Sequence, residues 1–393
     1  MADAYLVDGK RTAIGNFRGS LASVSAVELG TVAVHELLKQ NGLSGKEIDE
    51  VVLGCILQAG LGQNVARQVA LLAGIPKEKT ALTVNMVCGS GLRAVSVAAQ
   101  AIRCGDAELV VAGGTESMSN APYLLPKART GYGMGHAEIV DSMLHDGLWD
   151  IFNRYHMGIT AENLAQQYGL TRQMQDEFAA RSQQKAEQAI KEARFSEEIV
   201  PVSISQKKGD ATTFGVDEFP RFGTTAASLA KLRPAFKEGG TVTAGNASGI
   251  NDGAAAVLVA SEKAVAHYGL TPLARITSYA SAGVDPAIMG IGPAYAIRQA
   301  LSRAGWQLDD VELIEANEAF AAQSLAVAKE LGLDMQKVNV NGGAIALGHP
   351  IGASGARILV TLLHEMKRRR AHKGLAALCI GGGMGIAMCV ERA

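Results

Sequence analysis

Two cysteines and one histidine lie in settings where their side chains can do covalent chemistry. Cys88 lies in NMVCGSG (residues 85–91), where a β-like run ends and a helical pattern begins. A thiol at a helix N-terminus faces free N–H groups and the positive end of the helix dipole, which favour the thiolate and lower its pKa from about 8.5. We therefore expect Cys88 to be a nucleophile, and the alternative is a small buried hydrophobic residue.

Further residues can supply acid and base chemistry. His349 lies between glycine and proline in GAIALGHPIGASG (residues 343–355), just before a helical pattern, where stiff backbone would position a base; the alternative is a structural loop histidine. Cys379 follows an apolar run and precedes IGGGMG, a tight turn with free N–H groups. Asn317, in EANEAF (residues 315–320), follows a strand-like run, which suits either a polar site residue or a helix N-cap.

The composition excludes several classes of protein. There are 37 basic and 38 acidic residues, so the net charge of −1 provides no field that attracts nucleic acid. The five cysteines form no CxxC pair and no Cys/His cluster at zinc spacing, which predicts free thiols, a reducing compartment and no metal. The N-terminus has no leader pattern, and no apolar run approaches the ~18 residues of a membrane helix. We expect a cytoplasmic protein with no nucleic-acid or membrane partner.

The elements that must position these side chains alternate between β and α patterns, as in a layered α/β domain. Ser25 and Glu28 predict a capping box at the start of a helix. We expect helices at 25–39, 89–103 and 171–193, and strands at 5–7, 51–54, 81–85, 109–112, 254–260 and 274–281. Strand patterns are scarce in the middle of the chain, which indicates an insertion. The predicted units are 1–117 plus 250–270, the insertion 118–249, and 271–393.

The second α/β stretch repeats the first. Residues 47–54 resemble 307–315, and residues 108–119 resemble 374–385. Between each pair of landmarks a Val-Asn step, at 84–85 and 340–341, precedes a glycine-rich turn into a helix. Three matches in the same order predict a duplicated domain.

Taken together, these segments resemble the thiolase family over essentially the whole chain, because VCGSG, NEAF, GHPIG and CIGGGMG occur in the family's order. The resemblance implies the α/β thiolase fold: duplicated βαβαβαββ halves in five layers (αβαβα), with an inserted loop domain that binds coenzyme A. It implies an acetyl-CoA C-acetyltransferase activity, in which two acetyl-CoA condense reversibly to acetoacetyl-CoA and CoA. It also implies no cofactor, since CoA thioesters are the substrates, and a homotetramer built from dimers.

The resemblance also implies catalytic roles. Cys88 becomes acylated after passing its proton to His349, and Cys379, as a thiolate, removes a proton from C2 of the second acyl-CoA. The backbone N–H groups of Cys88 and Gly381 form one oxyanion hole. His349 and a water held by Asn317 form the other.

Substrate contacts follow from the same resemblance. The runs YHMGIT (residues 155–160) and MGIGP (residues 289–293) are similar to the short-chain, biosynthetic branch. His156 would contact the thioester region, while Met157 and Met289 would close the acyl pocket, with plain core packing as their alternative role. The CoA tail would lie on the insertion, at Arg221, Ser228, Ala244 and Ser248.

Three other functions compete with this interpretation. A degradative 3-ketoacyl-CoA thiolase would share the machinery and have a longer acyl slot. A condensing enzyme for carrier-protein thioesters normally uses Cys with two His, or with His and Asn, so the second thiol at Cys379 argues against it. The intact set of Cys88, His349 and Cys379 argues against a non-catalytic acyl-CoA carrier.

Overall fold

The computed structural model describes residues 3–206 and 209–393. Its centre is an 11-stranded sheet in the order β15-β16-β17-β14-β1-β13-β5-β3-β4, with β2 and β10 at its margin. The elements on the N-terminal side of the sheet are β1 (Ala4–Thr12), β2 (Gly15–Asn16), α1 (Ala26–Gln40), β3 (Glu50–Gly54), α2 (Val65–Leu72), β4 (Thr80–Val84), α3 (Ser90–Cys104), β5 (Leu109–Ser117), β13 (Asn251–Ser261) and α7 (Glu262–Tyr268).

The C-terminal part of the chain builds the other side of the sheet. Its elements are β14 (Ala274–Gly283), η3 (Pro286–Ile291), α8 (Gly292–Ala304), η4 (Leu308–Asp310), β15 (Leu313–Ala316), α9 (Ala321–Leu331), α10 (Ala344–Leu347), α11 (Ile351–Arg369), β16 (Lys373–Ile380) and β17 (Met384–Arg392). The two sides meet where β1 and β14 pair antiparallel through Leu6 and Ala274.

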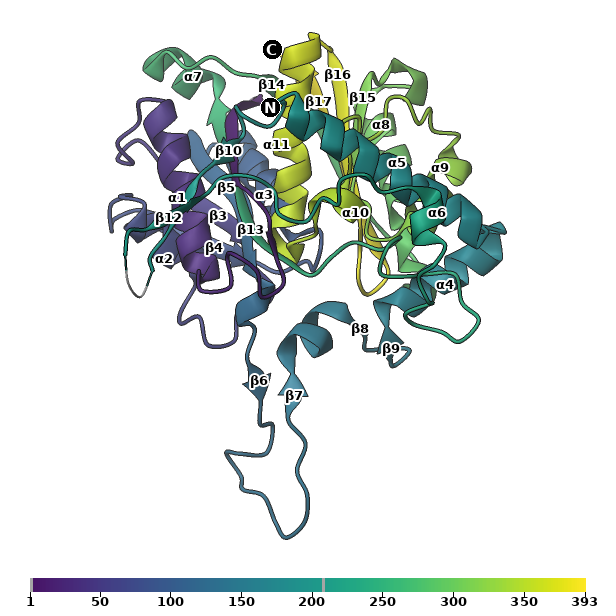
Figure 1. The fold of residues 1–393 in the computed structure, drawn as a ribbon. Coiled ribbons are helices and arrows are strands. Elements are labelled where there is room, and N and C mark those ends of the chain that lie inside the picture. The colour runs from purple at the N-terminus through teal and green to yellow at the C-terminus, as the bar shows by residue number, and fades with distance from the viewer. Residues whose placement is uncertain (1–2, 207–208) are drawn as a thin grey trace.

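The helices α3 and α11 lie between the two sides of the sheet. They pack on each other, and α11 contacts β5 and β13 on one side and β15 and β16 on the other (Figure 1). Helices α1 and α2 cover the outer face of the N-terminal side, and α8 covers that of the C-terminal side. This gives five layers, α, β, α, β and α, and a core of aliphatic side chains fills the space around the central helices.

The region between β5 and β13 is built mainly from helices and very short strands. Its elements are η1 (Met118–Asn120), β6 (Tyr123–Leu124), β7 (Val140–Asp141), η2 (Met143–Leu148), β8 (Trp149–Asp150), β9 (Tyr155–His156), α4 (Met157–Tyr168), α5 (Arg172–Lys191), β10 (Ile199–Val200), β11 (Val202–Ile204), β12 (Thr212–Phe214) and α6 (Ala226–Leu229). The hairpin of β6 and β7 projects from the body as an arm (Figure 1).

The expected elements all form. Most lie within three residues of their expected bounds, but β1 and β5 each continue five residues beyond their expected C-terminal ends. The capping box at α1 is present: Ser25 Oγ accepts the N–H of Glu28, and the Glu28 carboxylate accepts the N–H of Ser25 at 2.8 Å. The repeated segments also occupy matching places. Strand β3 pairs parallel with β5, and β15 pairs parallel with β16. On their other sides, β5 and β16 pair antiparallel with β13 and β17. The step at residues 340–341 differs from the other repeats. Just before this step, Val338 forms only an isolated β-bridge with Ile314, where the first copy has the strand β4.

Glycines let α3 and α11 approach each other at their N-terminal ends. A Cβ on Gly91 would lie 2.6 Å from the backbone nitrogen of Ala356, and one on Gly355 would lie 2.4 Å from that of Leu92. These distances are far inside van der Waals contact, so a side chain at either position would separate the helices.

We predict that Gly91→Ala lowers the free energy of unfolding by about 2 kcal/mol or more, because the added methyl group overpacks the contact between α3 and α11. Urea denaturation measures the loss. Gly133→Ala is the matched control, since a Cβ there meets no atom within 4 Å, and its effect should stay within about 0.5 kcal/mol. Equal losses in both variants would contradict the prediction.

Candidate active site

The turn that carries Cys88 is strained and is held by the side chain of Ser90. Val87, a β-branched residue, has a φ of 45°, in the left-handed region that such residues rarely adopt. The Ser90 hydroxyl donates to the carbonyl of Val87 at 2.7 Å and accepts the N–H of Met86 at 2.8 Å. These bonds fix the backbone immediately before α3, so Cys88 lies just ahead of the helix N-cap, Gly89.

The thiol of Cys88 does not titrate as its position ahead of a helix predicts. Burial raises its pKa to about 11, although the N–H groups of Gly381 and of Cys88 itself favour the thiolate. The nearby carboxylate of Glu116 adds to the rise. The expectation of a lowered pKa is therefore wrong for the resting site, because the loss of hydration outweighs the helix terminus. The resting Cys88 is a neutral thiol.

The imidazole of His349 is neutral and has a fixed tautomer. Its Nδ1 lies 2.5 Å from Ser354 Oγ, and the Ser354 hydroxyl donates its proton to the carbonyl of Pro350 at 2.8 Å. Ser354 can therefore only accept from Nδ1–H, which leaves the lone pair on Nε2. Burial, with the positive charge of Arg357 as a second cause, lowers the pKa of His349 to about 4. Its backbone N–H donates to Asn251 Oδ1 at 2.9 Å.

Asn317 lies beside this imidazole. Its Nδ2 is 3.5 Å from His349 Nε2, and within the described residues its buried Oδ1 has no hydrogen-bond partner. A small cavity of about 10 Å³ touches Asn317, which is room for roughly one water. The capping alternative is wrong, because the next helix, α9, begins at Ala321 with Phe320 as its N-cap.

Cys379 is the penultimate residue of β16 and is fully buried. Burial raises its pKa well above the usual value, and negative charge on Cys88 raises it further. The two sulfur atoms, which come from the N-terminal and C-terminal parts of the chain, therefore lie close enough for a charge on Cys88 to oppose the ionisation of Cys379. Cys379 does not belong to the lining of the adjoining cavity, whereas Gly381, two residues later, does.

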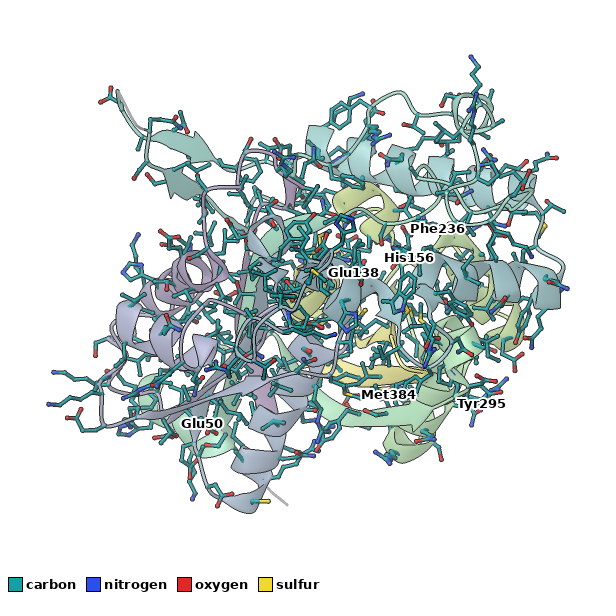
Figure 2. All side chains as sticks on the ribbon, turned by 90° about the horizontal axis from the view of Figure 1, so that it is seen from below. Glu50, Glu138, His156, Phe236, Tyr295 and Met384 are labelled. Atoms are coloured by element: carbon teal, nitrogen blue, oxygen red, sulfur yellow. The ribbon has the colours of Figure 1, made fainter. Side chains whose placement is uncertain are left out.

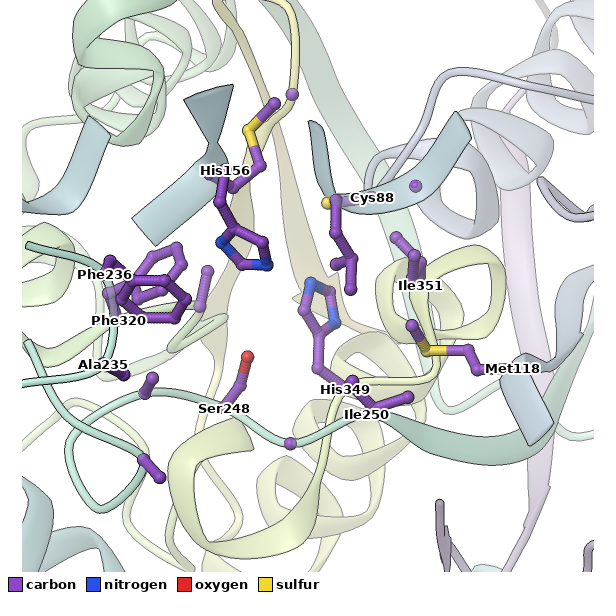
Figure 3. A pocket seen from close by; sticks show the side chains of 18 of the residues that line it. Cys88, Met118, His156, Ala235, Phe236, Ser248, Ile250, Phe320, His349 and Ile351 are labelled. Carbon is purple, nitrogen blue, oxygen red and sulfur yellow. The ribbon is translucent and has the colours of Figure 1, made fainter. Parts of the chain in front are cut away.

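A cavity of about 320 Å³ joins the sulfur of Cys88 to the insertion (Figure 3). Nine of the twelve expected site residues line it, and Asn317, Cys379 and Ser228 do not. Ser228 lies exposed on α6, with its hydroxyl bonded to the carbonyl of Thr225 at 2.7 Å. Those that line the cavity are Cys88, His156, Met157, Arg221, Ala244, Ser248, Met289, His349 and Gly381.

His156 is oriented by two contacts. The N–H of Gly158 donates to its Nδ1 at 3.0 Å, and its ring stacks on Phe236 at 4.5 Å between centroids with 19° between planes (Figures 2 and 3). Because Nδ1 accepts, the ring proton lies on Nε2. Burial lowers the pKa of His156, which favours this uncharged form. His156 therefore offers the cavity one hydrogen-bond donor.

The sequence did not identify four residues that build this site: Asn251, Ser354, Glu116 and Phe236. Ser354 had a usable signal, since it follows His349 by five residues on the first turn of a helix. Glu116 accepts the N–H groups of Leu57 at 3.1 Å and Gly352 at 2.9 Å, and so ties a wall of the site to the start of α11. These partners are distant in sequence, so no local pattern marks Glu116.

Two absences apply to residues 3–206 and 209–393. No group of three or more His, Cys, Asp or Glu side chains is arranged to hold a metal ion. No helix in that part of the chain is long and apolar enough to cross a membrane.

Comparison with known proteins places the whole chain in one family. Residues 4–263 match the family description "Thiolase, N-terminal domain", and residues 270–392 match "Thiolase, C-terminal domain". The acetyl-CoA acetyltransferase of Pseudomonas aeruginosa is 64% identical, and that of Cupriavidus necator is 60% identical, each with 100% of both chains covered. The crystal structure of the Bacillus anthracis acetyl-CoA acetyltransferase is 48% identical with a TM-score of 0.98, and covers 100% of this chain and 99% of that chain.

We predict that His349 makes the protein less stable in mild acid. Its pKa is about 4 in the folded protein and near 6.5 when unfolded, so only the unfolded chain takes up this proton as the pH falls between those values. From about pH 7.5 to about pH 5, urea denaturation should show the wild type losing about 2 kcal/mol more unfolding free energy than His349→Asn. Identical pH dependence in the two proteins would refute the assignment.

Proposed function

Because the chain belongs to the thiolase family and has its fold, we propose that it is an acetyl-CoA C-acetyltransferase, which condenses two acetyl-CoA reversibly to acetoacetyl-CoA and CoA. The relatives at 64% and 60% identity carry that activity in their names, which favours short-chain chemistry over the degradative, longer-chain alternative. The observation that carries the proposal is the neutral thiol of Cys88, which adjoins the Gly381 N–H and shares a cavity with a histidine that carries its lone pair on Nε2.

In the first half-reaction, Cys88 gives its proton to His349 Nε2 as Sγ attacks the thioester carbonyl carbon. A preformed ion pair is not required, because both groups are uncharged at rest. The N–H groups of Cys88 and Gly381 stabilise the oxyanion, and one such donor contributes about 3 to 4 kcal/mol to catalysis. The C–S bond to coenzyme A breaks, the CoA thiolate takes up a proton, and an acetyl group remains on Cys88.

Acylation changes the ionisation of the second thiol. Negative charge on Cys88 opposes ionisation of Cys379, and a thioester at Cys88 carries no charge. Cys379 can then give its proton to the departing CoA thiolate while His349 holds the proton from Cys88. The negative charge of the Cys379 thiolate and the positive charge of the His349 imidazolium then stabilise each other within the dry site. Acylation of Cys88 therefore comes first, and it produces the Cys379 thiolate that serves as the base in the second step.

In the second half-reaction, Cys379 removes a proton from C2 of the incoming acetyl-CoA. His349, with a water held by Asn317 Oδ1, stabilises the enolate oxygen. This role is supported by the buried Oδ1 itself, which has no hydrogen-bond partner within the described part of the chain. The carbanion attacks the acetyl carbonyl, the bond to Cys88 breaks, and the Cys88 sulfur recovers a proton. The product is acetoacetyl-CoA.

The insertion, residues 118–249, binds the CoA tail in this proposal. Arg221, Ala244 and Ser248 come from it and line the cavity, and so does His156, whose Nε2–H points to a role on the thioester. Ser228 is exposed on α6, outside the cavity, so any contact it makes is with the outer end of the tail. Met157 and Met289 close the acyl end as buried, cavity-lining side chains. The chemistry uses no cofactor besides the substrates.

We predict that acetyl-CoA leaves one acetyl group on the protein and that Cys88→Ala abolishes it. Cys379→Ala should still acquire the adduct but lose condensation by at least about 1,000-fold, because only the proton abstraction at C2 needs this thiol. Mass spectrometry and acetoacetyl-CoA formation give the two readouts, and Cys104→Ala, at an exposed thiol, is the control. Normal condensation by Cys379→Ala would show that the base is another residue.

We also propose a cytoplasmic homotetramer built from dimers. The five free thiols fit a reducing compartment. The arm exposes large apolar side chains, among them Tyr123 at 63% and Ile139 at 61%, and the edge strand β4 exposes Leu82 at 45%. Apolar surface on an arm and on a sheet edge is suited to burial against further copies of the chain.

We predict that replacing residues 125–139 by a short Gly-Ser turn converts tetramers into dimers, since this removes the apolar tip of the arm and leaves β4 intact. Analytical ultracentrifugation measures the change. Leu82→Glu should instead disrupt the dimer by placing a charge on the edge strand. Tetramers in both variants would exclude these two surfaces as the interfaces.

A further inference from the structure

A buried ion pair behind the site is not explained by the proposed mechanism. Arg357, on α11, and Glu315, on β15, are each 2% exposed, and Arg357 Nη1 lies 3.6 Å from Glu315 Oε2. Within the described residues, Arg357 Nη1 and Nη2 and Glu315 Oε2 have no hydrogen-bond partner. A buried pair with such incomplete bonding contributes little to stability, so its presence calls for another explanation.

The other acids near Arg357 are already bound elsewhere. Asp217 accepts hydrogen bonds from Arg11 Nη1 and Nη2, at 2.7 and 2.9 Å. Glu198 accepts from Arg11 Nε at 2.7 Å and from the Thr361 hydroxyl at 3.1 Å. Near Glu315, Glu318 accepts from Ser182, Asn339 and the N–H of Ile345, and Glu365 pairs with Arg368 and Arg369. Glu315 is therefore the one acid within the described residues that remains for Arg357.

The pair lies between the elements that carry His349 and Asn317, the two side chains assigned to the enolate oxygen in the proposed mechanism. Helix α11 begins two residues after His349, and strand β15 ends at the residue before Asn317. The backbone N–H of Asn317 donates to Ala377 at 2.9 Å, so β15 sets the place of Asn317 just as α11 sets that of His349. Helix α11 packs on β15, and Arg357 and Glu315 are the basic and the acidic side chain that meet in that contact. Burial raises the pKa of Glu315 to about 8, and the charge of Arg357 acts against this rise.

We propose that Arg357 and Glu315 are positioning residues, which join the helix after His349 to the strand before Asn317 and so fix the spacing of these two side chains. The inference rests on the proposed function, because it assigns the pair to the oxyanion hole for the enolate.

The charge of Arg357 has a second effect on the same site. It opposes protonation of His349, in addition to burial. The charged groups that face Arg357 are Glu315 on β15, Arg11 on β1, and Glu198 and Asp217 on the surrounding loops. An uncharged His349 is the form that can accept the proton of Cys88, so Arg357 keeps the base available at mildly acid pH.

The test compares Arg357→Met, Arg357→Lys and the double variant Arg357→Met/Glu315→Leu, which removes the pair without leaving one buried charge. In acetoacetyl-CoA thiolysis, we expect the double variant to lose about 10-fold in kcat with KM nearly unchanged, because the spacing of the oxyanion hole relaxes. The acid limb of its pH profile should move up by about one pH unit. Arg357→Lys should keep the acid limb of the wild type.

The matched control is Leu363→Ala, which weakens the core on the same helix, at a residue 1% exposed, without touching a charge. If Leu363→Ala reproduces the kcat loss and the pH shift, or if the double variant behaves as the wild type, the positioning role is wrong. NMR titration of the His349 ring gives a readout that does not depend on turnover, and an unchanged titration in the double variant would also overturn the electrostatic part. A wild type that forms no acetyl-Cys88 would refute the proposed function instead.

Discussion

The site depends on the close approach of α3 and α11 between the two sides of the sheet. Each helix begins two residues after a proposed catalytic side chain, Cys88 for α3 and His349 for α11. Gly91 and Gly355 bring the helix ends so close that neither position has room for a Cβ. These two glycines therefore serve packing, and this packing sets the distance between Cys88 and His349, the proposed nucleophile and base.

Desolvation is the dominant electrostatic effect in the cavity. It raises the pKa of both thiols and lowers that of His349, so all three groups are uncharged before substrate binds. In a site of this kind, charge appears only during the reaction, where fixed N–H groups and side chains are already oriented. The strained Val87 and the two fixed histidine tautomers are the structural means of that orientation.

Local patterns predicted most of the fold and drew attention to Cys88 and His349, which the structure places on one cavity. Helix starts such as Ser25 and the turn at Cys88 are encoded by neighbours in sequence, so they can be read directly. The direction of the Cys88 pKa could not be read in this way, because it depends on groups such as Gly381 and Glu116 that arrive from other elements. The same reason applies to Phe236 beneath His156 and to the place of Ser228 outside the cavity.

The duplication explains how one chain supplies two complementary groups at one place. The Val-Asn steps at 84–85 and 340–341 precede corresponding turns, and these turns lead into α3 and α11. One copy carries a thiol at the turn and the other an imidazole, and the pairing of β1 with β14 brings the copies together with the two helices inside. The second thiol has no such counterpart, since the corresponding stretch of β5 contains Gly113, where a Cβ would lie 2.1 Å from the carbonyl oxygen of Ala255. Close packing in the first copy therefore excludes a side chain at this position, which in the second copy carries the thiol that we propose as the base for C2.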